Sequence, residues 1–135
     1  MEASAGPNLP YEGTIHETLG ITALEATPDR VVLRMPVGPR VAQPMGLLHG
    51  GASAVIAESA ASIGAFLNCE PGGYTVGTDL NISHLRAKSD GHVTATAVPA
   101  RKGRSMHVWT IEITGEDGEL VAIARCTLAI RKAKG

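Results

Sequence analysis

The sequence predicts an α+β fold in which a long antiparallel β-sheet wraps around one central helix of small residues. Residues 49–67 form the convincing helical segment, and twelve of these nineteen residues are Gly, Ala or Ser. After residue 73 the sequence changes to strand-like segments separated by turns. The chain holds one Trp, two Tyr and one Phe. The core must therefore consist mainly of Ala, Val, Ile and Leu, which favours close approach of the backbones.

The N-terminal half of the chain supplies two short strands and the helix. Residues 1–19 are rich in Gly, Pro and polar residues, and they predict an arm or a short helix that stops at Gly20. Residues 20–26 and 30–37 predict strands around a turn, and a loop with prolines and glycines leads into the helix. The helix is apolar on nearly every face, which predicts that it is buried. Residues 20–135 are expected to form one domain.

Four longer strands are predicted after the helix. The first covers residues 74–88 and ends at a Ser-Asp-Gly turn, and in the second, residues 92–101, apolar residues alternate with threonine. The third, residues 105–114, carries Trp109 on one apolar face. An Asp-Gly hairpin signal then leads into residues 119–131. We expect hairpin turns to join these strands into an antiparallel sheet.

Length, charge and cysteine content limit the classes of protein. A chain of 135 residues fits one domain with a modest core. The balance of 12 Lys+Arg against 13 Asp+Glu predicts no nucleic-acid partner and no anionic membrane, and the most apolar stretch, residues 52–67, is too polar for a membrane span. The two cysteines lack metal-ligand spacing, and no secretory signal is visible. A cytoplasmic protein with reduced cysteines is expected.

Glu58 is the first candidate for a functional residue. It lies in the middle of the predicted helix, and no Lys or Arg stands three or four residues away from it. An unpaired carboxylate is costly to bury, so Glu58 either reaches solvent at one wet edge of the helix or serves a function. Ser62 follows four residues later on the same helix face, where its hydroxyl can bind the carboxylate or a water beside it.

The start of the helix is the second candidate. Residues 43–51 read Gln-Pro-Met-Gly-Leu-Leu-His-Gly-Gly, which places glycines where the helix begins. Free N–H groups there bind anions or polarise a carbonyl, and glycine lets a ligand approach the backbone. His49 and Glu58 are nine residues apart, about 13 Å along a helix and on opposite sides of it. A site that uses both must therefore be shared between two symmetry-related subunits.

These residues together carry a resemblance to a known family. The run from Gln43 to Ser62, QPMGLLHGGASAVIAESAAS, resembles the active-site segment of hot-dog thioesterases, and the likeness extends from about residue 20 to residue 131. The most similar branch contains Arthrobacter-type 4-hydroxybenzoyl-CoA thioesterases and 1,4-dihydroxy-2-naphthoyl-CoA hydrolases. Phenylacetate-pathway thioesterases are similar too, but typically place Asp at the position of Glu58. The resemblance implies a hot-dog fold that hydrolyses an acyl-CoA to a free acid and coenzyme A, with no metal or other cofactor.

The resemblance also implies a role for each catalytic residue. Glu58 would attack the thioester carbonyl or activate water to do so. The Gly50 N–H would polarise the carbonyl oxygen beside the Gln43 side chain, and losing such a donor typically costs about 2.7–4 kcal/mol of barrier. His49 would lie beside the departing thiolate, and Ser62 would hold the hydrolytic water or Glu58. Family sites of this kind span a dimer, commonly within a tetramer built from two dimers.

Coenzyme A also needs a surface for its phosphates and adenine. The basic loop at residues 101–104 fits, because Arg and Lys bind phosphates and glycine allows close backbone approach. Taken alone, however, these charges are more simply those of an exposed hairpin turn. In the family, the end of the central strand also contacts the nucleotide, and Gly77 matches a position that lines the acyl or pantetheine end. The expected substrate-binding residues are Gly77, His84, Leu85, Arg86, Ala87, Arg101, Lys102, Gly103, Arg104, Ser105 and Met106.

Two other functions remain open at this point: a non-catalytic acyl-CoA-binding module, and a proofreading thioesterase that acts on acyl groups held by carrier proteins. The branch favours an aromatic acyl group, although medium-chain acyl groups are equally compatible with the sequence. His16, His92 and His107 show no partner spacing and are interpreted as ordinary surface or strand residues. Without HExxH or clustered carboxylates, no metal site is expected.

Overall fold

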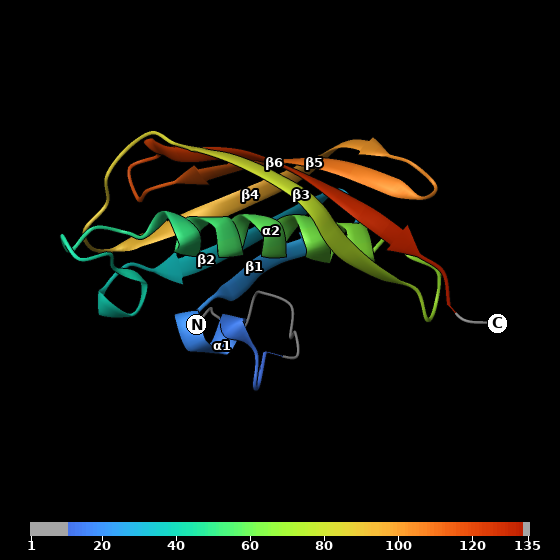
Figure 1. Ribbon diagram of the computed structural model, residues 1–135, viewed down its shortest axis with the longest axis horizontal. Coiled ribbons are helices and arrows are strands. Elements are labelled where there is room, and N and C mark those ends of the chain that lie inside the picture. Colours follow the sequence, from blue (N-terminus) through green and yellow to red (C-terminus); the bar gives the residue numbers. More distant parts are fainter. Residues whose placement is uncertain (1–10, 134–135) are drawn as a thin grey trace.

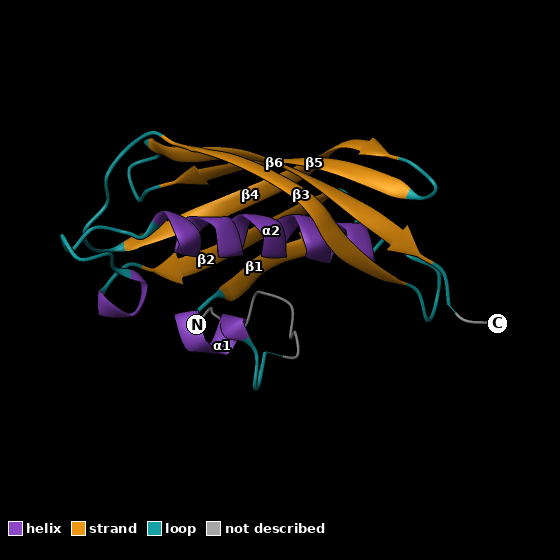
Figure 2. Cartoon of the chain, viewed as in Figure 1, coloured by secondary structure: helices purple, strands orange, loops and turns teal. Residues whose placement is uncertain are grey.

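Helix α2 lies in the concave face of a curved sheet of six antiparallel strands, with the short helix α1 to one side (Figures 1 and 2). The computed structural model describes residues 11–133, so the predicted arm falls mostly outside the described residues. The predicted α+β architecture is confirmed. Its elements are α1 (Ile15–Leu19), β1 (Thr22–Thr27), β2 (Arg30–Pro36), the 3₁₀ turn η2 (Pro39–Val41), α2 (Gly50–Phe66), β3 (Tyr74–His84), β4 (His92–Lys102), β5 (Met106–Thr114) and β6 (Leu120–Arg131).

The order of the strands differs from a series of hairpins. The sheet runs β1-β2-β4-β5-β6-β3, so β3 pairs with β6 at one edge and is not joined to β4 by a hairpin. Strand β4 instead pairs with β2, where Val31, Leu33 and Met35 stand opposite small or branched apolar residues of β4 and are fully buried. Burial of these matched apolar faces places β4 in the centre and leaves β3 at the edge.

Strand β3 ends at His84, four residues earlier than the sequence predicts. His84 is the last residue of β3 in register with β6. The next two N–H groups, of Leu85 and Arg86, both donate to the carbonyl oxygen of Val121, at 2.8 and 3.2 Å. Two donors converging on one acceptor cannot continue a ladder. The chain therefore turns away from the sheet, and residues 85–88 form a loop.

Only one face of α2 is covered within a single chain. Ile56, Ala57, Ala60 and Ala61 are fully buried against the sheet, and Gly64 packs so closely on Trp109 that a Cβ there would come within 2.3 Å of the indole ring. The opposite face, which includes residues 55, 58, 59, 62, 63 and 66, retains accessible surface. The prediction of burial on every side therefore fails for a single chain, because the sheet wraps around one side of the helix.

Helix α1 is short and is held at its C-terminus. Gly20 follows it in the left-handed conformation (φ 75°), as expected for a helix stop. The guanidinium of Arg40 donates to the Thr18 carbonyl oxygen at 3.0 Å and ties α1 to the chain beside η2. Within residues 11–133 no helix is long and apolar enough to cross a membrane.

Candidate active site

Helix α2 begins with two hydrogen-bond donors left free. His49 is the N-cap residue, and its Nδ1 accepts a hydrogen bond from the Gly51 N–H at 2.7 Å. A neutral His49 therefore carries its proton on Nε2, where it can donate to a ligand. The Gly50 N–H makes no hydrogen bond among the described residues. Both donors lie at the positive end of the helix dipole.

The side chain of Gln43 provides a third donor. Its Oε1 accepts hydrogen bonds from the backbone N–H groups of Met45 and Leu47. Since only the oxygen of a carboxamide can accept them, its NH₂ group is the free end of the side chain. The loop around it is closed by the Gln43 N–H, which donates to the Leu47 carbonyl oxygen at 2.8 Å. Gln43 is thus held as a donor before any ligand arrives.

Gln43 and Gly50 line a pocket of about 380 Å³ at the start of α2, here called the N-terminal pocket. One wall is the loop that carries Gln43 and Gly50, and the other is the end of β3 with the loop after it. A hydrogen bond of 2.7 Å from the Leu48 N–H to the Lys88 carbonyl oxygen joins the two walls. The pocket brings together six residues that the sequence predicts for the site: Gln43, Gly50, His84, Leu85, Arg86 and Ala87. The sequence did not single out Ser53, a buried residue that also lines it.

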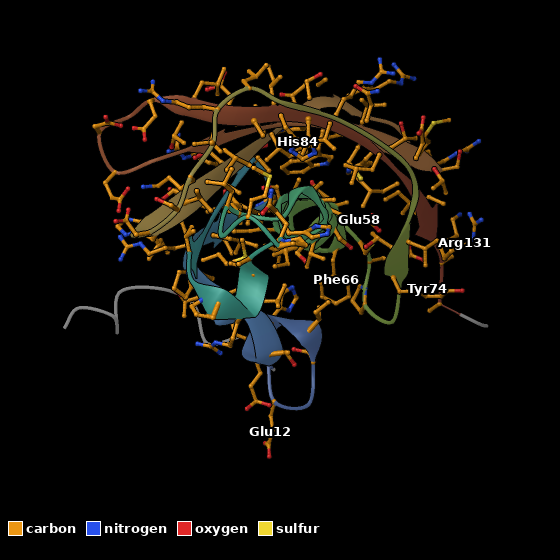
Figure 3. The ribbon with its side chains drawn as sticks, turned by 60° about the vertical axis from the view of Figure 1, so that its left-hand side comes forward. Glu12, Glu58, Phe66, Tyr74, His84 and Arg131 are labelled. Atoms are coloured by element: carbon orange, nitrogen blue, oxygen red, sulfur yellow. The ribbon has the colours of Figure 1, made fainter. Side chains whose placement is uncertain are left out.

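Glu58 lies elsewhere, in the middle of α2 and against β3 (Figure 3). Its side chain is exposed and takes part in no ion pair or hydrogen bond within residues 11–133. The carboxylate occupies the space that a side chain at Gly77 would fill, because a Cβ there would come within 2.4 Å of Glu58 Oε2. The ladder between β3 and β6 shifts register between Gly77 and Asp79, so a β-bulge opens the strand where it meets the carboxylate.

A second pocket, of about 440 Å³, surrounds Glu58 and is here called the Glu58 pocket. This volume is within the range of small-molecule sites. Ser62 lines it, and its hydroxyl lies 3.1 Å from the Thr75 hydroxyl, which also donates to the Ser62 carbonyl oxygen at 3.3 Å. Since Thr75 has one proton to donate, Ser62 gives its own proton to Thr75 and remains an acceptor towards the pocket. Sequence reasoning missed Thr75, although it lies two residues before Gly77 on the same face of β3.

Cys126, the cysteine near Glu58, is not a candidate nucleophile. Burial, followed by the negative charges of Glu58 and Asp79, raises the pKa of the Cys126 thiol to about 12. The residue therefore stays a thiol at neutral pH, and only a thiolate is a good nucleophile. Both cysteines of the chain are free.

A single chain does not bring all the predicted catalytic residues together. Gly50 and Glu58 are eight residues apart, about 12 Å along the helix, and the two pockets share no lining residue. His49 lines neither of them; it lies in a smaller hollow beside Arg40. Of the other predicted catalytic residues, only Ser62 shares a pocket with Glu58.

The two predicted CoA-binding segments also lie far apart in one chain. His84 is in register with Ala122 and Ile113, whereas Met106 stands at the other end of β5. The seven steps from Met106 to Ile113 span about 24 Å at 3.4 Å per residue. The loop at residues 101–106 therefore lies at the opposite end of the sheet from residues 84–87. One of its cations, Lys102, pairs with Asp29 at 2.5 Å.

The remaining histidines occupy three different environments. His107 is buried on β5, where its Nδ1 accepts from Trp109 Nε1 at 3.1 Å, and His92 lies on β4 near Glu116. The interpretation as an ordinary surface residue does not hold for His16, whose ring lines the Glu58 pocket. Among residues 11–133, no group of three or more His, Cys, Asp or Glu is placed to hold a metal ion.

Comparison with known proteins gives consistent matches along nearly the whole chain. Residues 45–122 match the family model of the thioesterase superfamily. The chain is 43% identical over 120 residues to 1,4-dihydroxy-2-naphthoyl-CoA hydrolase of Listeria monocytogenes, covering 89% of this chain and 98% of that protein. It is 41% identical over 118 residues to the proofreading thioesterase EntH of Cronobacter sakazakii, covering 87% and 86%. A crystal structure of a thioesterase of class EC 3.1.2 from Haemophilus influenzae superposes with a TM-score of 0.88 at 37% identity, covering 93% of this chain and 87% of that one.

Proposed function

The chain belongs to the thioesterase superfamily and is a thioester-hydrolysing enzyme with the hot-dog fold, and from that premise we propose that its substrates are acyl-CoA thioesters. The observation that carries this proposal is the N-terminal pocket. It combines the free donors of Gly50 and Gln43 with His84 and Arg86 on the opposite wall. N–H donors such as those of Gly50 and Gln43 bind a thioester carbonyl oxygen, and a guanidinium such as that of Arg86 binds phosphate.

The donors act where charge develops in the reaction. When the carbonyl carbon is attacked, its oxygen becomes negative, and the Gly50 N–H and the Gln43 NH₂ donate to it. Because Gln43 Oε1 is already held by two backbone N–H groups, little reorganisation is needed at the transition state. One such donor contributes about 2.7–4 kcal/mol. The C–S bond then breaks, and we assign the Nε2–H of His49, the residue before Gly50, to the departing thiolate.

Glu58 supplies the carboxylate that drives the attack. In one route it takes a proton from water, the water oxygen forms the new C–O bond, and the proton passes to the CoA thiolate. In the other route Glu58 attacks the carbonyl itself, and water then hydrolyses the resulting anhydride. The absence of an ion pair to Glu58 among the described residues supports both routes, because a paired carboxylate is a weaker base. The acceptor oxygen of Ser62 can hold the water.

We propose that each active site is shared between two subunits. The 12 Å between Gly50 and Glu58 along one helix, the uncovered face of α2 and the free edge of β3 support this. Antiparallel pairing of two β3 strands would place the His84 end of one subunit beside the Tyr74 end of its partner. The basic loop at residues 101–106 lies at that same end, so a partner could also bring its cations towards the nucleotide. Two such dimers would form the proposed tetramer.

The proposed acyl group is aromatic, such as a hydroxybenzoyl or dihydroxynaphthoyl group. The similarity to a 1,4-dihydroxy-2-naphthoyl-CoA hydrolase and the size of the Glu58 pocket support it. A second candidate is proofreading of acyl groups on carrier proteins, which the similarity to a proofreading thioesterase favours. Because the chain is an enzyme, a binding module without turnover is no longer a candidate. No metal or other cofactor is needed for either reaction.

Thiol release from acyl-CoAs tests this proposal directly. Benzoyl, hydroxybenzoyl, dihydroxynaphthoyl and hexanoyl esters would be compared in wild type, Glu58→Gln and the control Glu12→Gln, a carboxylate that points away from the sheet (Figure 3). We expect Glu58→Gln to lower kcat by about 10³-fold or more at unchanged oligomeric state, with Glu12→Gln unaffected. Equal activity in all three proteins would remove Glu58 from the mechanism. Hydrolysis of carrier-bound acyl groups in preference to acyl-CoA would establish the second candidate.

A further inference from the structure

One side chain of the Glu58 pocket has no part in the reaction described above. His16, from helix α1, lines this pocket opposite the residues of α2. Its Nε2 is enclosed and has no hydrogen-bond partner within residues 11–133. The ring as a whole is only partly buried, so the rest of it forms part of the pocket wall. The other ring nitrogen, Nδ1, is not enclosed and makes no hydrogen bond within residues 11–133, so it is the nitrogen that a ligand in the pocket can reach.

Tyr11 places a second enclosed polar group next to His16. The ring of Tyr11 lies 4.8 Å from that of His16, and the Tyr11 hydroxyl is also enclosed without a partner among the described residues. Burial lowers the pKa of His16 and raises the pKa of Tyr11. At neutral pH both groups are therefore uncharged. They can take part in hydrogen bonds but bring no charge to the pocket.

The position of His16 sets it apart from the other polar residues of the pocket. Glu58, Ser59 and Ser62 all come from α2, and the rest of the lining is apolar apart from His16. No ion pair joins His16 to Glu58 in the described part of the chain. An acyl group whose carbonyl carbon is near Glu58 therefore points its far end towards other walls of the pocket, one of which His16 forms.

We propose that His16 determines substrate specificity by forming a hydrogen bond with a hydroxyl group on the acyl part of the substrate. This inference rests on the proposed function, because it assigns the Glu58 pocket to the acyl group. In a neutral imidazole the accessible nitrogen, Nδ1, is an N–H donor in one tautomer and a bare acceptor in the other, and a hydroxyl can pair with either form. A carboxylate could only accept, and an ammonium group could only donate. A hydroxyl is thus the group that fits the ring in both tautomers.

The discrimination comes from Nδ1, which an unsubstituted acyl group covers and leaves without a partner. A site built to bind a hydroxyl rejects the analogue that lacks it, because the polar group of the protein is then desolvated and unpaired. We expect wild type to prefer the best hydroxylated acyl group over the unsubstituted one by about tenfold in kcat/KM.

The experiment compares benzoyl-CoA with 2-, 3- and 4-hydroxybenzoyl-CoA in wild type, His16→Phe and His16→Asn. Phe keeps the ring without a nitrogen, whereas Asn places an amide group where Nδ1 stood. The readout is the ratio of kcat/KM for each hydroxylated ester to that for benzoyl-CoA. We expect this ratio to fall about tenfold in His16→Phe and to recover in large part in His16→Asn. Thr18→Val, an exposed position on the same helix, is the matched control and should keep the wild-type ratio.

The same comparison is made by direct binding, so that the inference can be separated from the proposed reaction. In the Glu58→Gln background, the dissociation constants of the four esters are measured with and without His16→Phe. A binding preference that disappears in His16→Phe supports the inference even where wild type shows no turnover, and such lack of turnover would count against the proposed function alone. A ratio that His16→Phe leaves unchanged, or a wild type that binds all four esters equally, would overturn the inference.

Discussion

The start of helix α2 and its middle build their parts of the site in different ways. At the start, local hydrogen bonds fix the donor groups: Gln43 Oε1 is held by two backbone N–H groups, and His49 Nδ1 by the Gly51 N–H. In the middle, Glu58 has no hydrogen-bond or ion-pair partner among residues 11–133 and meets only the open space at Gly77. The region at the start of α2 is therefore rigid, and the region around Glu58 is open.

This difference follows from what each group has to do. Donors that stabilise a transition state work best when they are oriented in advance, since they then cost no reorganisation during the reaction. A carboxylate that serves as a base or nucleophile loses basicity when it is paired, so it has to stay free. In the proposed dimer the open region is completed by the partner subunit, which would pair with the free edge of β3 beside it.

The largest expected effect comes from mixing two inactive proteins. Glu58→Gln removes the carboxylate, and Gln43→Ala removes a donor from the other region. If a site takes Gln43 from one subunit and Glu58 from its partner, half of the dimers in a random mixture are mixed, and each has one intact site. Activity should then return to about a quarter of the wild-type value from a far lower starting level, as measured by thiol release after co-expression. Mixed dimers that are verified by mass and remain inactive would show that the site lies within one chain.

Matched glycine substitutions compare the two regions directly. Gly77→Ala places a Cβ 2.4 Å from Glu58 Oε2, and Gly50→Ala places one 2.8 Å from His84 Nε2. Both neighbours are the ends of side chains that can move, so both proteins should fold. Displacing a reacting group by about 1 Å costs about 10²-fold. We therefore expect Gly77→Ala to lower kcat by about that factor, and Gly50→Ala mainly to raise KM for CoA esters.

Gly64→Ala is the contrasting control for this pair. Its Cβ would lie 2.3 Å from the buried ring of Trp109, which has no room to move. Overpacking of this kind destabilises a core by about 1–3 kcal/mol, so the free energy of unfolding should fall in chemical denaturation. A Gly77→Ala protein as unstable as Gly64→Ala would mean that Gly77 serves the fold and not the carboxylate.

The sequence identified the residues of the two regions better than their arrangement. Helical spacing placed Ser62 on the face of Glu58, and the two do share a pocket. Strand periodicity located β3, but it could not show that β3 pairs with β6 at the edge, because alternation describes the faces of a strand and not its neighbours. The hydrogen bond from Leu48 to Lys88 joins segments forty residues apart, so no local pattern predicts the N-terminal pocket.

The position of His16 is a second feature that the sequence could not predict. No motif connects it with Glu58 in the sequence, since forty-two residues separate them. They line one pocket because α1 is held beside η2, where Arg40 donates to the Thr18 carbonyl oxygen. The sequence did place His16 four residues before the helix stop expected at Gly20, which is where the short helix α1 lies.

His49 has a structural role as the N-cap of α2 and a proposed role in the reaction, and two substitutions separate them. His49→Ala removes the acceptor of the Gly51 N–H and should cost about 0.5–2 kcal/mol of stability as well as activity. His49→Asn keeps a capping oxygen but loses the Nε2–H. It should therefore unfold at the same denaturant concentration as wild type while hydrolysing thioesters more slowly. Full activity in His49→Asn would reduce His49 to a helix cap.

The smallest expected effect concerns an ion pair behind the N-terminal pocket. A hydrogen bond from the Lys88 ammonium, together with backbone N–H groups, lowers the pKa of Glu116 from 4.5 to about 2. Because the pKa in the folded state is depressed, the stabilisation is fully present above about pH 4.5 and is lost as the pH falls through about 2. Since Glu116 is exposed, the effect is small and is screened by salt. The Tm difference between wild type and Glu116→Gln should therefore shrink between pH 5 and pH 2, and also in 1 M salt at pH 7.

Glu116→Gln should also affect the two regions of the site differently, and KM and kcat report the difference. Lys88 carries the carbonyl oxygen that binds the Leu48 N–H, so a looser Lys88 widens the N-terminal pocket and leaves Glu58 in place. We expect Glu116→Gln to raise KM by a few-fold with kcat nearly unchanged, since losing binding energy that the ground state and the transition state share raises KM alone. Glu25→Gln breaks the ion pair with Arg30 between β1 and β2, away from both pockets, and is the control for loss of a surface pair. If Glu116→Gln lowered kcat instead, the two regions would be mechanically coupled, and the division between a rigid and an open half of the site would not hold.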